Sequence, residues 1–382
     1  AGHAIECGAQ VTGGNYPFLD ELAPGYPGFP ICEVAADGSC VVTKQPGTGG
    51  AVNVGTVTAQ LLYELGDPRY ENPDAAARFD TIRLTQLAED RVEVAGTRGE
   101  PPPATLKVAL NFDAGYRNTM SLVLTGLDVE AKAERATSLL FELLGGTDQF
   151  DHVDVQLLRT DHPDAPTNPE ATALLRITVM DTDKDTVGRR FSNAVTELVL
   201  ASYAGFYTTT PPTDASAYGE YWPLLIDREL VEHRVVLEDG ETIVVPHATP
   251  AAHAVAAPPP PAAPPPAGPT RRAPLGTVCG ARSGDKGGNA NVGVWALSDE
   301  GYAWLAETLT VERFKALVTE AAALEVRRYE LANLRALNFV VVGLLGAGVA
   351  SSTRYDPQAK GLGEYLRSRV LDVPEALVRH RG

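Results

Sequence analysis

Long hydrophobic runs and cysteines are scarce in this sequence of 382 residues, and each scarcity argues against a class of protein. No apolar run reaches the roughly 20 residues of a membrane-spanning helix, so we expect a soluble protein with no membrane partner. Only four cysteines occur, and no C-x-x-C pair is among them. This spacing gives no support to a zinc ribbon or a thioredoxin-type site, and it favours reduced thiols in a cytoplasmic protein.

The two closest cysteines, Cys32 and Cys40, flank the dipeptide Asp37-Gly38, which is typical of a tight turn. In a two-residue hairpin at this position, Cys32 pairs with Thr43 and Cys40 pairs with Ala35. Because the side chains of a strand alternate between its faces, the two thiols then lie on opposite faces. We therefore expect no disulfide between them.

Several motifs of enzymes and metal proteins are also missing. The glycine-rich stretch that ends at Gly50 continues with Ala51, not with the Lys-Ser/Thr of a Walker A loop. Gly346-Ala347-Gly348 lacks the third glycine of a dinucleotide fingerprint, and no G-x-S-x-G elbow of a serine hydrolase occurs. The acidic and histidine-containing runs at 151–154, 161–162 and 181–185 match no zinc or calcium spacing. We expect no metal and identify no cofactor.

Negative charge predominates, but it is unevenly distributed along the chain. The net charge is −17, made up of +3 in residues 271–382 (15 Lys and Arg against 12 Asp and Glu) and −20 in the remainder. So acidic a body argues against a nucleic acid partner. The mildly basic segment could dock on the acidic one or bind an anion, or the two could simply be domains with different solvated surfaces.

An Ala/Pro-rich segment, residues 248–274, predicts an extended and partly stiff linker. It divides the chain into a main domain, residues 1–247, and a smaller domain, residues 275–382. The main domain alternates strand and helix patterns, which predicts an α/β or α+β fold. Four strand patterns and two helical regions predict a small α+β sandwich after the linker. The two domains are expected to fold separately.

Hydrophobic periodicity and turn signals give the expected elements. In the main domain they are a hairpin at 31–44, a helix at 57–65, short strands at 106–112 and 120–124, a helix at 129–144, strands at 152–158 and 174–180, a helix from 186 and a hairpin at 234–245. After the linker they are strands at 275–279, 291–297, 327–331 and 339–344, helices at 302–307 and 311–318, and a last helix that starts at Asp356-Pro357.

The stretch 282–291 (RSGDKGGNAN) is the most informative one, and we expect it to be a long polar loop between two strands. Glycines allow successive backbone N–H groups to converge on an anion, and Arg or Lys adds positive charge. A carboxylate between two cations stays ionised, which suits Asp285 to orient a group or to accept a proton. Asp285 and Lys286 are the candidate catalytic residues, and the candidate ligand-binding residues are Arg282, Gly284, Gly287, Gly288, Asn289 and Asn291. A mobile hairpin with an internal ion pair is the alternative.

A second glycine-rich stretch, 44–50, lies between a predicted strand and a predicted helix. Backbone N–H groups near a helix N-terminus favour phosphate or carboxylate, so this stretch is a candidate anion site. A plain tight turn is the alternative. Its candidate ligand-binding residues, together with one from the similar stretch 12–15, are Lys44, Gly47, Thr48, Gly49, Gly50 and Asn15.

The chain begins without methionine, in the largely apolar segment AGHAIECG. A mature protein that has lost a signal peptide and a fragment cut upstream of an element are both compatible with this start. The lack of polarity favours the fragment.

Several segments resemble the acyclic terpene utilisation (AtuA-like) family. Before the linker these are the stretches 5–15, 42–50, 56–63, 115–118 and 125–128. After it, RSGDKGGNANVGVWA at 282–296, Leu337-Asn338-Phe339 and the stretch 358–366 are similar to the C-terminal module of the family. The resemblance implies a ferredoxin-like fold for that module and a further segment upstream of Ala1.

The same resemblance implies a role in the catabolism of acyclic terpenes such as citronellol and geraniol. It points to a small anionic substrate, a branched acyl-CoA or the related acid, with the coenzyme A thioester as substrate and not as cofactor. Lyase, hydratase or isomerase chemistry fits the absence of redox motifs. A non-catalytic binding or scaffold protein of the same pathway is the alternative, and the sequence is compatible with a homo-oligomer.

Overall fold

The computed structural model of this protein describes residues 1–209, 211–247 and 263–378. Contacts between Cα atoms divide the chain into two compact units. Unit 1 contains residues 1–109, 223–349 and 356–382, and unit 2 contains residues 110–222 and 350–355. Unit 1 therefore takes residues from both sides of the expected linker, most of which (248–262) lies outside the described residues. Separate folding of residues 275–382 stays a prediction.

Unit 1 contains the expected α+β sandwich. Its sheet is antiparallel, with the strand order β16-β17-β19-β18. The strands are β16 (Cys279–Lys286), β17 (Asn289–Ala296), β18 (Val326–Leu331) and β19 (Ala336–Val341). One face of the sheet packs in an apolar core with α6 (Asp299–Thr308), α7 (Val311–Leu317) and α8 (Leu362–Ser368). The strand β16 lies at an edge of this sheet, so one side of its backbone has no strand neighbour within the sheet.

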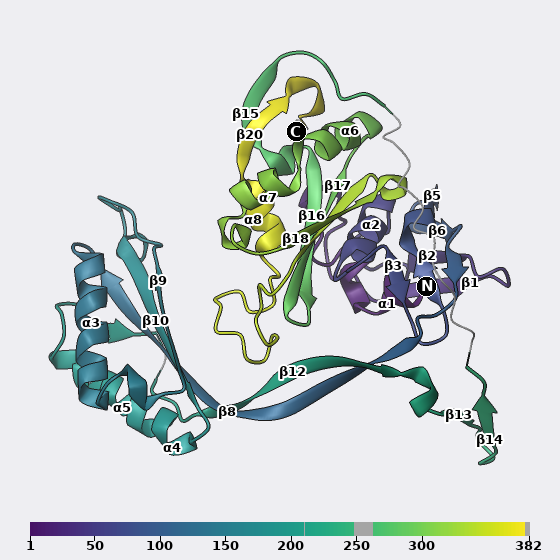
Figure 1. The fold of residues 1–382 in the computed structure, drawn as a ribbon. Helices are drawn as coiled ribbons and strands as arrows, with labels where there is room; N and C mark the ends of the chain where they lie inside the picture. The colour runs from purple at the N-terminus through teal and green to yellow at the C-terminus, as the bar shows by residue number, and fades with distance from the viewer. Residues whose placement is uncertain (210, 248–262, 379–382) are drawn as a thin grey trace. The chain divides into compact units, whose positions relative to one another are not determined.

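The other face of the same sheet is covered by α2 (Val54–Leu62), which comes from the beginning of the chain. Figure 1 shows α2 on the opposite side of β16 from α7 and α8. Alternation along β17 accounts for this arrangement, because Val292 and Val294 point into the core with α6 to α8 while Trp295 packs with α2. A sheet with two covered faces therefore joins residues that are more than 200 positions apart in the sequence.

Local sequence explains where α2 begins. The side chain of Asn53 accepts a hydrogen bond from the Thr56 N–H, and the Thr56 hydroxyl accepts one from the Asn53 N–H, which is a reciprocal capping box. Thr56 to Leu62 are all buried, so the helix is held by packing more than by its intrinsic propensity. The expected helix at 57–65 is confirmed, with both its start and its end three residues earlier.

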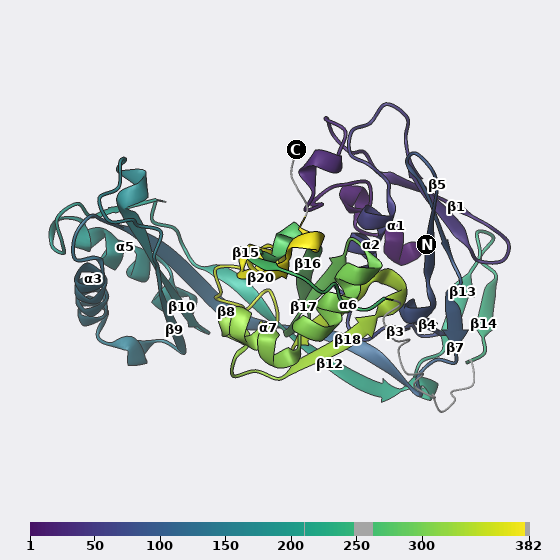
Figure 2. The same ribbon diagram turned by 90° about the horizontal axis from the view of Figure 1, so that it is seen from above.

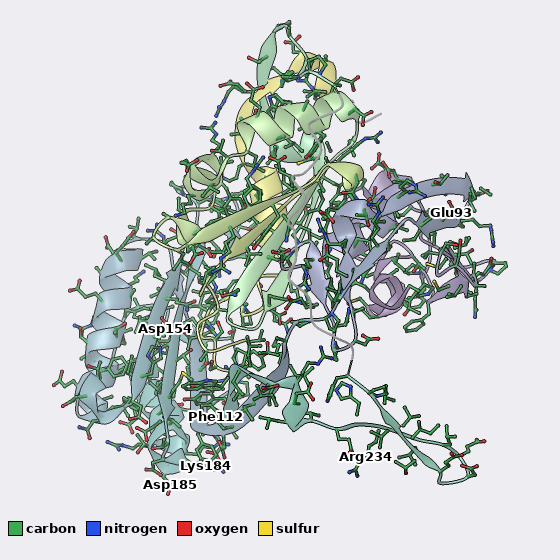
Figure 3. The ribbon with its side chains drawn as sticks, turned by 45° about the vertical axis from the view of Figure 1, so that its right-hand side comes forward. Glu93, Phe112, Asp154, Lys184, Asp185 and Arg234 are labelled. Atoms are coloured by element: carbon green, nitrogen blue, oxygen red, sulfur yellow. The ribbon has the colours of Figure 1, made fainter. Side chains whose placement is uncertain are left out.

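Small sheets and short helices complete unit 1. A four-stranded sheet has the order β1-β2-β6-β5 and a three-stranded sheet the order β3-β4-β7, and two strand pairs, β13-β14 and β15-β20, stand alone. The elements are α1 (Gly2–Ile5), β1 (Pro30–Val34), β2 (Cys40–Lys44), β3 (Arg69–Glu71), β4 (Ala76–Arg78), β5 (Arg83–Ala88), β6 (Arg91–Ala95), β7 (Arg98–Glu100), β13 (His233–Val236), β14 (Thr242–Val245), β15 (Thr270–Pro274) and β20 (Val370–Pro374). The expected hairpin about Asp239-Gly240 is confirmed, and Figure 3 shows Arg234 on its strand β13.

The register of the first hairpin corrects the argument about the two cysteines. Cys32 pairs with Val42, and Cys40 pairs with Val34, so both thiols lie on one face of the sheet and not on opposite faces. The connection is longer than two residues, since the Ala35 N–H donates to the Ser39 carbonyl, and this shifts the pairing by one residue. Burial and a hydrogen bond with Cys40 raise the pKa of the Cys32 thiol to about 11. Both cysteines are free thiols.

Unit 2 is built on one antiparallel sheet with the order β11-β8-β10-β9, in which β12 also pairs with β8. Its elements are residues 110–125 of β8 (Thr105–Thr125), residues 216–222 of β12 (Ser216–Asp227), β9 (His152–Leu158), β10 (Thr172–Asp181), β11 (Tyr207–Thr208), α3 (Val129–Leu144), α4 (Lys184–Val187) and α5 (Arg189–Glu197). Helices α3 and α5 cover one face of the sheet (Figure 1). Gly145 ends α3 at a φ of 89°, as the sequence predicts. The acidic run at 181–185 leads from the end of β10 into α4, where Asp183 caps the helix by accepting the Asp185 N–H and Asp181 accepts the Asp183 N–H. Figure 3 shows Lys184 and Asp185 at one end of unit 2.

Two further expectations about elements are wrong. The short strands expected at 106–112 and 120–124 are parts of one strand, β8, because β12 runs alongside it and pairs with it (Figure 2). No helix starts at Asp356; the Asp356 carboxylate instead accepts the N–H groups of Lys360 and Gly361 in a turn, and α8 begins at Leu362. This turn carries Lys360 into the site described next.

Candidate functional site

The stretch 282–291 forms a β-hairpin and not the expected long loop. Asp285 pairs with Ala290 and Lys286 pairs with Asn289, so only Gly287 and Gly288 remain for the turn. Gly287 has a φ of 64°, a conformation that glycine adopts without strain. The charged side chains of the motif are therefore held on the edge strand of a sheet that is covered on both faces. That is a more rigid setting than a loop.

Glycines of the hairpin allow α2 to approach the sheet closely. A Cβ atom on Gly284 would lie 2.7 Å from the Glu64 Cγ, and one on Gly293 would lie 2.5 Å from the Leu62 Cβ. Gly288 packs against the Gly346 carbonyl in the same way, at 2.3 Å from an added Cβ. These glycines serve close packing, so the expected role of Gly284 and Gly288 in binding a ligand lacks support from their surroundings.

The asparagines of the hairpin also have structural partners. Asn291 is fully buried, and its Nδ2 donates to the Leu62 carbonyl at 2.8 Å, at the C-terminal end of α2. Its neighbour Asn338 on β19 donates to the Leu65 and Gly66 carbonyls at 2.9 and 2.7 Å. The Leu62 carbonyl also accepts the Leu65 N–H at 3.4 Å, so the two amides add hydrogen bonds that hold the chain just after α2. Asn289 accepts the Gly343 N–H at 2.8 Å.

Four polar side chains meet at the edge of β16. The Lys360 Nζ donates to Glu64 Oε1 at 2.5 Å, to Asp285 Oδ1 at 3.1 Å and to the Tyr63 hydroxyl. Burial alone disfavours the charged lysine, but the hydrogen bonds with Glu64, Tyr63 and Asp285 outweigh it and raise the pKa of Lys360. Burial raises the pKa of Tyr63 as well, so its hydroxyl keeps its proton at neutral pH. Glu64 has a φ of 55°, which is unusual for a residue with a side chain and is common where a functional site imposes strain.

Arg282 and Lys286 lie on the face of β16 that points toward α2. The Arg282 Nη2 donates to the neutral Gln10 side chain at 2.6 Å, and its guanidinium lies 5.1 Å from the centre of the Tyr63 ring. The Lys286 ammonium lies 5.4 Å from the centre of the Tyr70 ring. Loss of hydration lowers the pKa of both cations, for Lys286 with help from the neighbouring charge of Lys107. Among the described residues, no carboxylate lies within ion-pair distance of either one.

The first residues of the chain complete the cluster, and the sequence reasoning missed them. The His3 Nε2 lies 3.2 Å from the Gln60 carbonyl and its Nδ1 lies 3.1 Å from Glu6 Oε1. Burial, assisted by the charge of Lys286, lowers the pKa of His3 to about 4, so the ring is neutral at pH 7. Burial also raises the pKa of Glu6. The only signal for them was that Glu6 and Gln10 fall in a stretch with a family resemblance.

The second glycine-rich stretch does not have the free donors that were expected. The N–H groups of Gly49 and Gly50 donate to the carbonyls of Tyr26 and Ala23, at 2.9 and 2.8 Å. Lys44 is buried and pairs with Asp90 at 3.1 Å. Anion binding by this stretch, with Gly47 and Thr48, remains a prediction, but the N–H groups of Gly49 and Gly50 are already used within the tight turn that is the alternative.

Asn15 is exposed and has a φ of 59°, a backbone conformation that asparagine tolerates better than most residues. The Lys44 ammonium reaches the Thr48 carbonyl at 2.7 Å, which closes the turn. Neither Asn15 nor the stretch 44–50 forms a hydrogen bond or an ion pair with the described residues at the edge of β16. The candidate site consists therefore of Arg282, Asp285 and Lys286 of the predicted set, joined by Lys360 and by residues of α2 and the N-terminal segment.

Comparison with known families found two matches. Residues 1–237 match the family described as acyclic terpene utilisation family protein AtuA, and residues 273–372 match the AtuA ferredoxin-like domain. The chain belongs to the AtuA family. A search of curated proteins and a search of solved structures found no match. No helix among the described residues is long and apolar enough to cross a membrane.

The cluster takes residues from both regions that define the AtuA family. His3, Gln10, Tyr63 and Glu64 belong to the region 1–237, whereas the hairpin and Lys360 belong to the ferredoxin-like region. Both regions meet in unit 1, where α2 covers the ferredoxin-like sheet. The family implies a role in acyclic terpene utilisation.

Proposed function

We propose that the protein is a cytoplasmic enzyme of acyclic terpene catabolism that binds a branched acyl-CoA, or the related acid, at the edge of β16. The observation that carries this proposal is the pair of cations Arg282 and Lys286, which lie on one face of the strand. No carboxylate of the described residues pairs with either one. Cations that lose hydration without gaining a counter-ion favour an anionic ligand.

The two cations would bind the carboxylate or the thioester oxygen of the substrate. Gln10 holds Arg282 without neutralising it, and the rings of Tyr63 and Tyr70 supply favourable faces for the two positive groups. Because a developing enolate places its negative charge on the same oxygen, these contacts strengthen as the reaction proceeds.

Asp285 would act as the base. Its carboxylate accepts a hydrogen bond from the Lys360 Nζ at 3.1 Å, which orients it to take a proton from the carbon next to the substrate carbonyl. The electron pair of the C–H bond moves to the carbonyl oxygen. The protonated Asp285 then returns the proton to a different carbon, as in an isomerase, or to a departing β-hydroxyl, as in a lyase or hydratase.

A panel of branched acyl-CoA esters and acids, read for both binding and turnover, tests the proposal. Lys286→Ala should weaken binding roughly 10- to 100-fold, since a hydrogen bond to a charged group contributes about 1.5–3 kcal/mol. Asp285→Asn keeps the shape but loses the base, so turnover should fall while affinity is retained. Lys184→Ala removes an exposed lysine of unit 2 and is the matched control.

The results separate the proposal from its alternatives. If both variants bind and react like the parent, the hairpin is not the site and the proposal is wrong. If the parent binds a member of the panel without converting any, and Lys286→Ala weakens that binding, the protein is a non-catalytic binding protein of the same pathway.

A further inference from the structure

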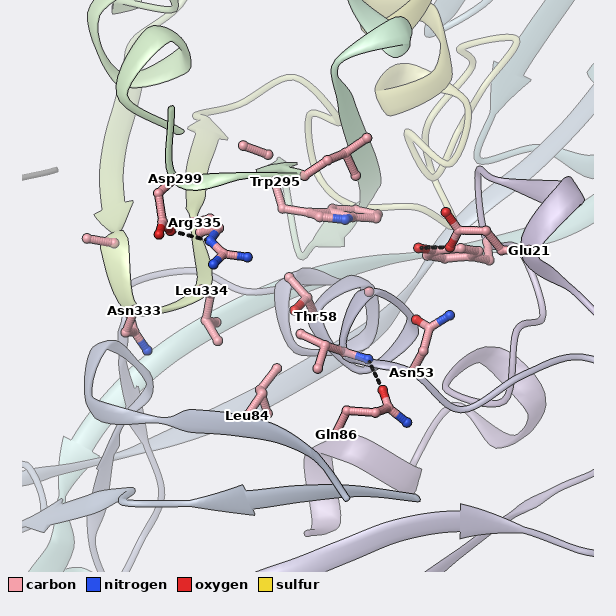
Figure 4. Close-up of a pocket in the computed structure, with 16 residues that line it drawn as sticks. Glu21, Asn53, Thr58, Leu84, Gln86, Trp295, Asp299, Asn333, Leu334 and Arg335 are labelled. Atoms are coloured by element: carbon pink, nitrogen blue, oxygen red, sulfur yellow. Dashed lines mark hydrogen bonds and ion pairs between the residues drawn. The ribbon is translucent and has the colours of Figure 1, made fainter. Parts of the chain in front are cut away.

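Two features of unit 1 lie outside the candidate site, and their surroundings differ. A pocket of about 610 Å³ opens at the N-terminal end of α2. Its charged side chains have partners within the pocket, since Asp299 pairs with Arg335 at 2.5 Å and Glu21 accepts a hydrogen bond from the Tyr16 hydroxyl at 3.0 Å (Figure 4). The second feature is the hairpin β13-β14, whose apolar side chains are exposed. The hairpin is therefore the feature that points to a partner.

The hairpin β13-β14 has an apolar surface on both of its faces. No third strand joins its two strands among the described residues. Side chains alternate along a strand, so Val235, Ile243 and Val245 lie on one face and Val236 and Val244 on the other. These five side chains are between 39% and 69% exposed. Because a two-stranded hairpin is marginally stable by itself in water, and exposed apolar patches mark interaction surfaces, this hairpin requires further strands beside it.

The backbone of β14 offers a free edge to such a strand. Next to the turn, the Leu237 N–H donates to the Glu241 carbonyl at 2.8 Å, so these two residues form a hydrogen-bonded pair. Pairs along an antiparallel ladder alternate between hydrogen-bonded and non-hydrogen-bonded ones. The backbone groups of Thr242 and Val244 therefore point away from β13, towards the free edge. Pro246 follows β14 and has no N–H, so an added strand pairs with the residues before it.

A second copy of the chain carries a strand that matches this edge. Two β14 strands can pair antiparallel about a two-fold axis when Ile243 lies opposite Ile243 of the second copy. In this register Thr242 of each copy lies opposite Val244 of the other, and these are the residues whose backbone groups are free. The same register places Asp239 opposite His247 of the second copy, and an imidazole can donate a hydrogen bond to a carboxylate.

Charge favours this antiparallel arrangement over a parallel one. The tip of the hairpin, residues 238–241, carries three carboxylates and no cation. A parallel pairing would bring the two tips together, whereas the antiparallel pairing separates them and brings each tip to the end of the second copy that carries His233 and His247. Two short strands bury less than the roughly 800 Å² per partner of a standard interface, so the contact should be weak and should depend on concentration.

We propose that β14 is the interface of a weak homodimer, in which two hairpins form one four-stranded antiparallel sheet with the order β13-β14-β14-β13. The occupant of the free edge is a second copy of this chain, because the edge is complementary to itself about the two-fold axis. The proposal rests on the hairpin alone and does not depend on the reaction proposed for the edge of β16.

Analytical ultracentrifugation of the full chain, between about 1 and 100 μM, tests the dimer. The average mass of the parent should rise with concentration from one chain towards two. Val244→Lys places an ammonium group at the paired edge, which is how natural edge strands prevent pairing, so it should weaken dimerisation at least tenfold. Val236→Lys is the matched control, because it makes the same change on β13, away from the paired edge, and should leave the dimer intact.

A cysteine on the two-fold axis tests the register. Opposite residues of a non-hydrogen-bonded pair have Cα atoms about 4.5 Å apart, a separation that suits a disulfide. Ile243→Cys should therefore give a disulfide-linked dimer on mild oxidation, seen on a non-reducing gel. Val245→Cys lies on the same face, but the two copies of this residue are roughly 13 Å apart along the strands, so it should not cross-link. The parent, with its own free cysteines, shows the background.

The results decide whether the proposal stands. A parent that stays monomeric up to about 100 μM overturns it, and so does equal cross-linking of the two cysteine variants. A dimer that survives Val244→Lys uses another surface, and one that is lost in Val236→Lys alone pairs through β13, so both results contradict the proposal. The proposed function stands or falls separately, since its test reads the binding and turnover of acyl-CoA esters and acids.

Discussion

The two glycine-rich stretches of the chain are similar in sequence, but their cationic side chains have different surroundings in the structure. In the stretch 44–50, Lys44 is turned inward, and the N–H groups of the last two glycines are used in the turn. In the stretch 282–291, the backbone is used by the strand pair β16-β17, and the charged side chains Arg282 and Lys286 stay without a counter-ion among the described residues.

This difference shows what decides whether a glycine-rich motif is a candidate site. A glycine can free the backbone to bind a ligand, or it can let another segment come close. In both stretches most of the glycines do the second. Whether a stretch can bind a ligand then depends on its charged side chains. These differ between the two stretches in their burial and in their partners.

The largest expected effect on stability comes from replacing Lys44, the lysine of the first stretch. The Lys44 side chain is 5% exposed and pairs with Asp90. Lys44→Ala should lower the free energy of unfolding by about 3 to 5 kcal/mol, because it leaves a partly buried carboxylate without its partner. Gly47→Ala is the control in the same stretch, since an added Cβ would meet nothing within 4 Å, and its φ of 79° should cost only about 1 kcal/mol.

Urea unfolding followed by tryptophan fluorescence measures both variants. The buried Trp295 and Trp304 report on unit 1, whereas Trp222, in unit 2, is 63% exposed. A cost for Lys44→Ala below that of Gly47→Ala would contradict the structural role of Lys44 and reopen this stretch as an anion site.

Much of the fold follows from patterns that act over short distances. The periodicity of α2, the glycine that ends α3 and the Asp-Gly turn of β13-β14 all depend on residues close to one another in the chain, and all three are confirmed. The small α+β sandwich is also confirmed, because its strands and helices were predicted from local hydrophobic periodicity.

Features that depend on distant partners could not be predicted in this way. Nothing near Asn291 reveals that its amide holds the end of a helix more than 200 residues earlier. Likewise, Lys360 reaches Glu64 only because a turn at Asp356 brings it to the edge of β16. The cysteine register failed because one extra residue in a turn reverses the faces of a strand. The site was therefore predicted only in its hairpin part.

A smaller loss of stability is expected when the pH is lowered. It tests the burial of His3 in the N-terminal segment that packs beside the hairpin. The pKa of His3 is about 4 in the folded protein and near 6.5 in an unfolded chain, so the folded state binds fewer protons between these values. Stability should therefore fall as the pH drops from 6.5 towards 4, by about 2 to 3 kcal/mol from this group. Urea unfolding at pH 7 and pH 4.5 should show this loss in the parent and less of it in His3→Gln. An equal loss in both would show that His3 is not the group responsible.

The smallest effect on stability is expected at the lysine of the second stretch. Part of the Lys286 side chain is exposed, although its ammonium loses some of its hydration. It has a ring contact but no carboxylate partner within ion-pair distance in the described part of the chain, so Lys286→Ala should change the free energy of unfolding by no more than about 0.5 kcal/mol. The same substitution thus separates the two stretches: it removes a buried structural contact at Lys44 and only an unused positive charge at Lys286. Urea unfolding of both variants under one set of conditions makes the comparison direct. If Lys286→Ala costs more than about 1.5 kcal/mol, as loss of a charge-assisted hydrogen bond would, Lys286 is a structural residue and its assignment to the ligand fails.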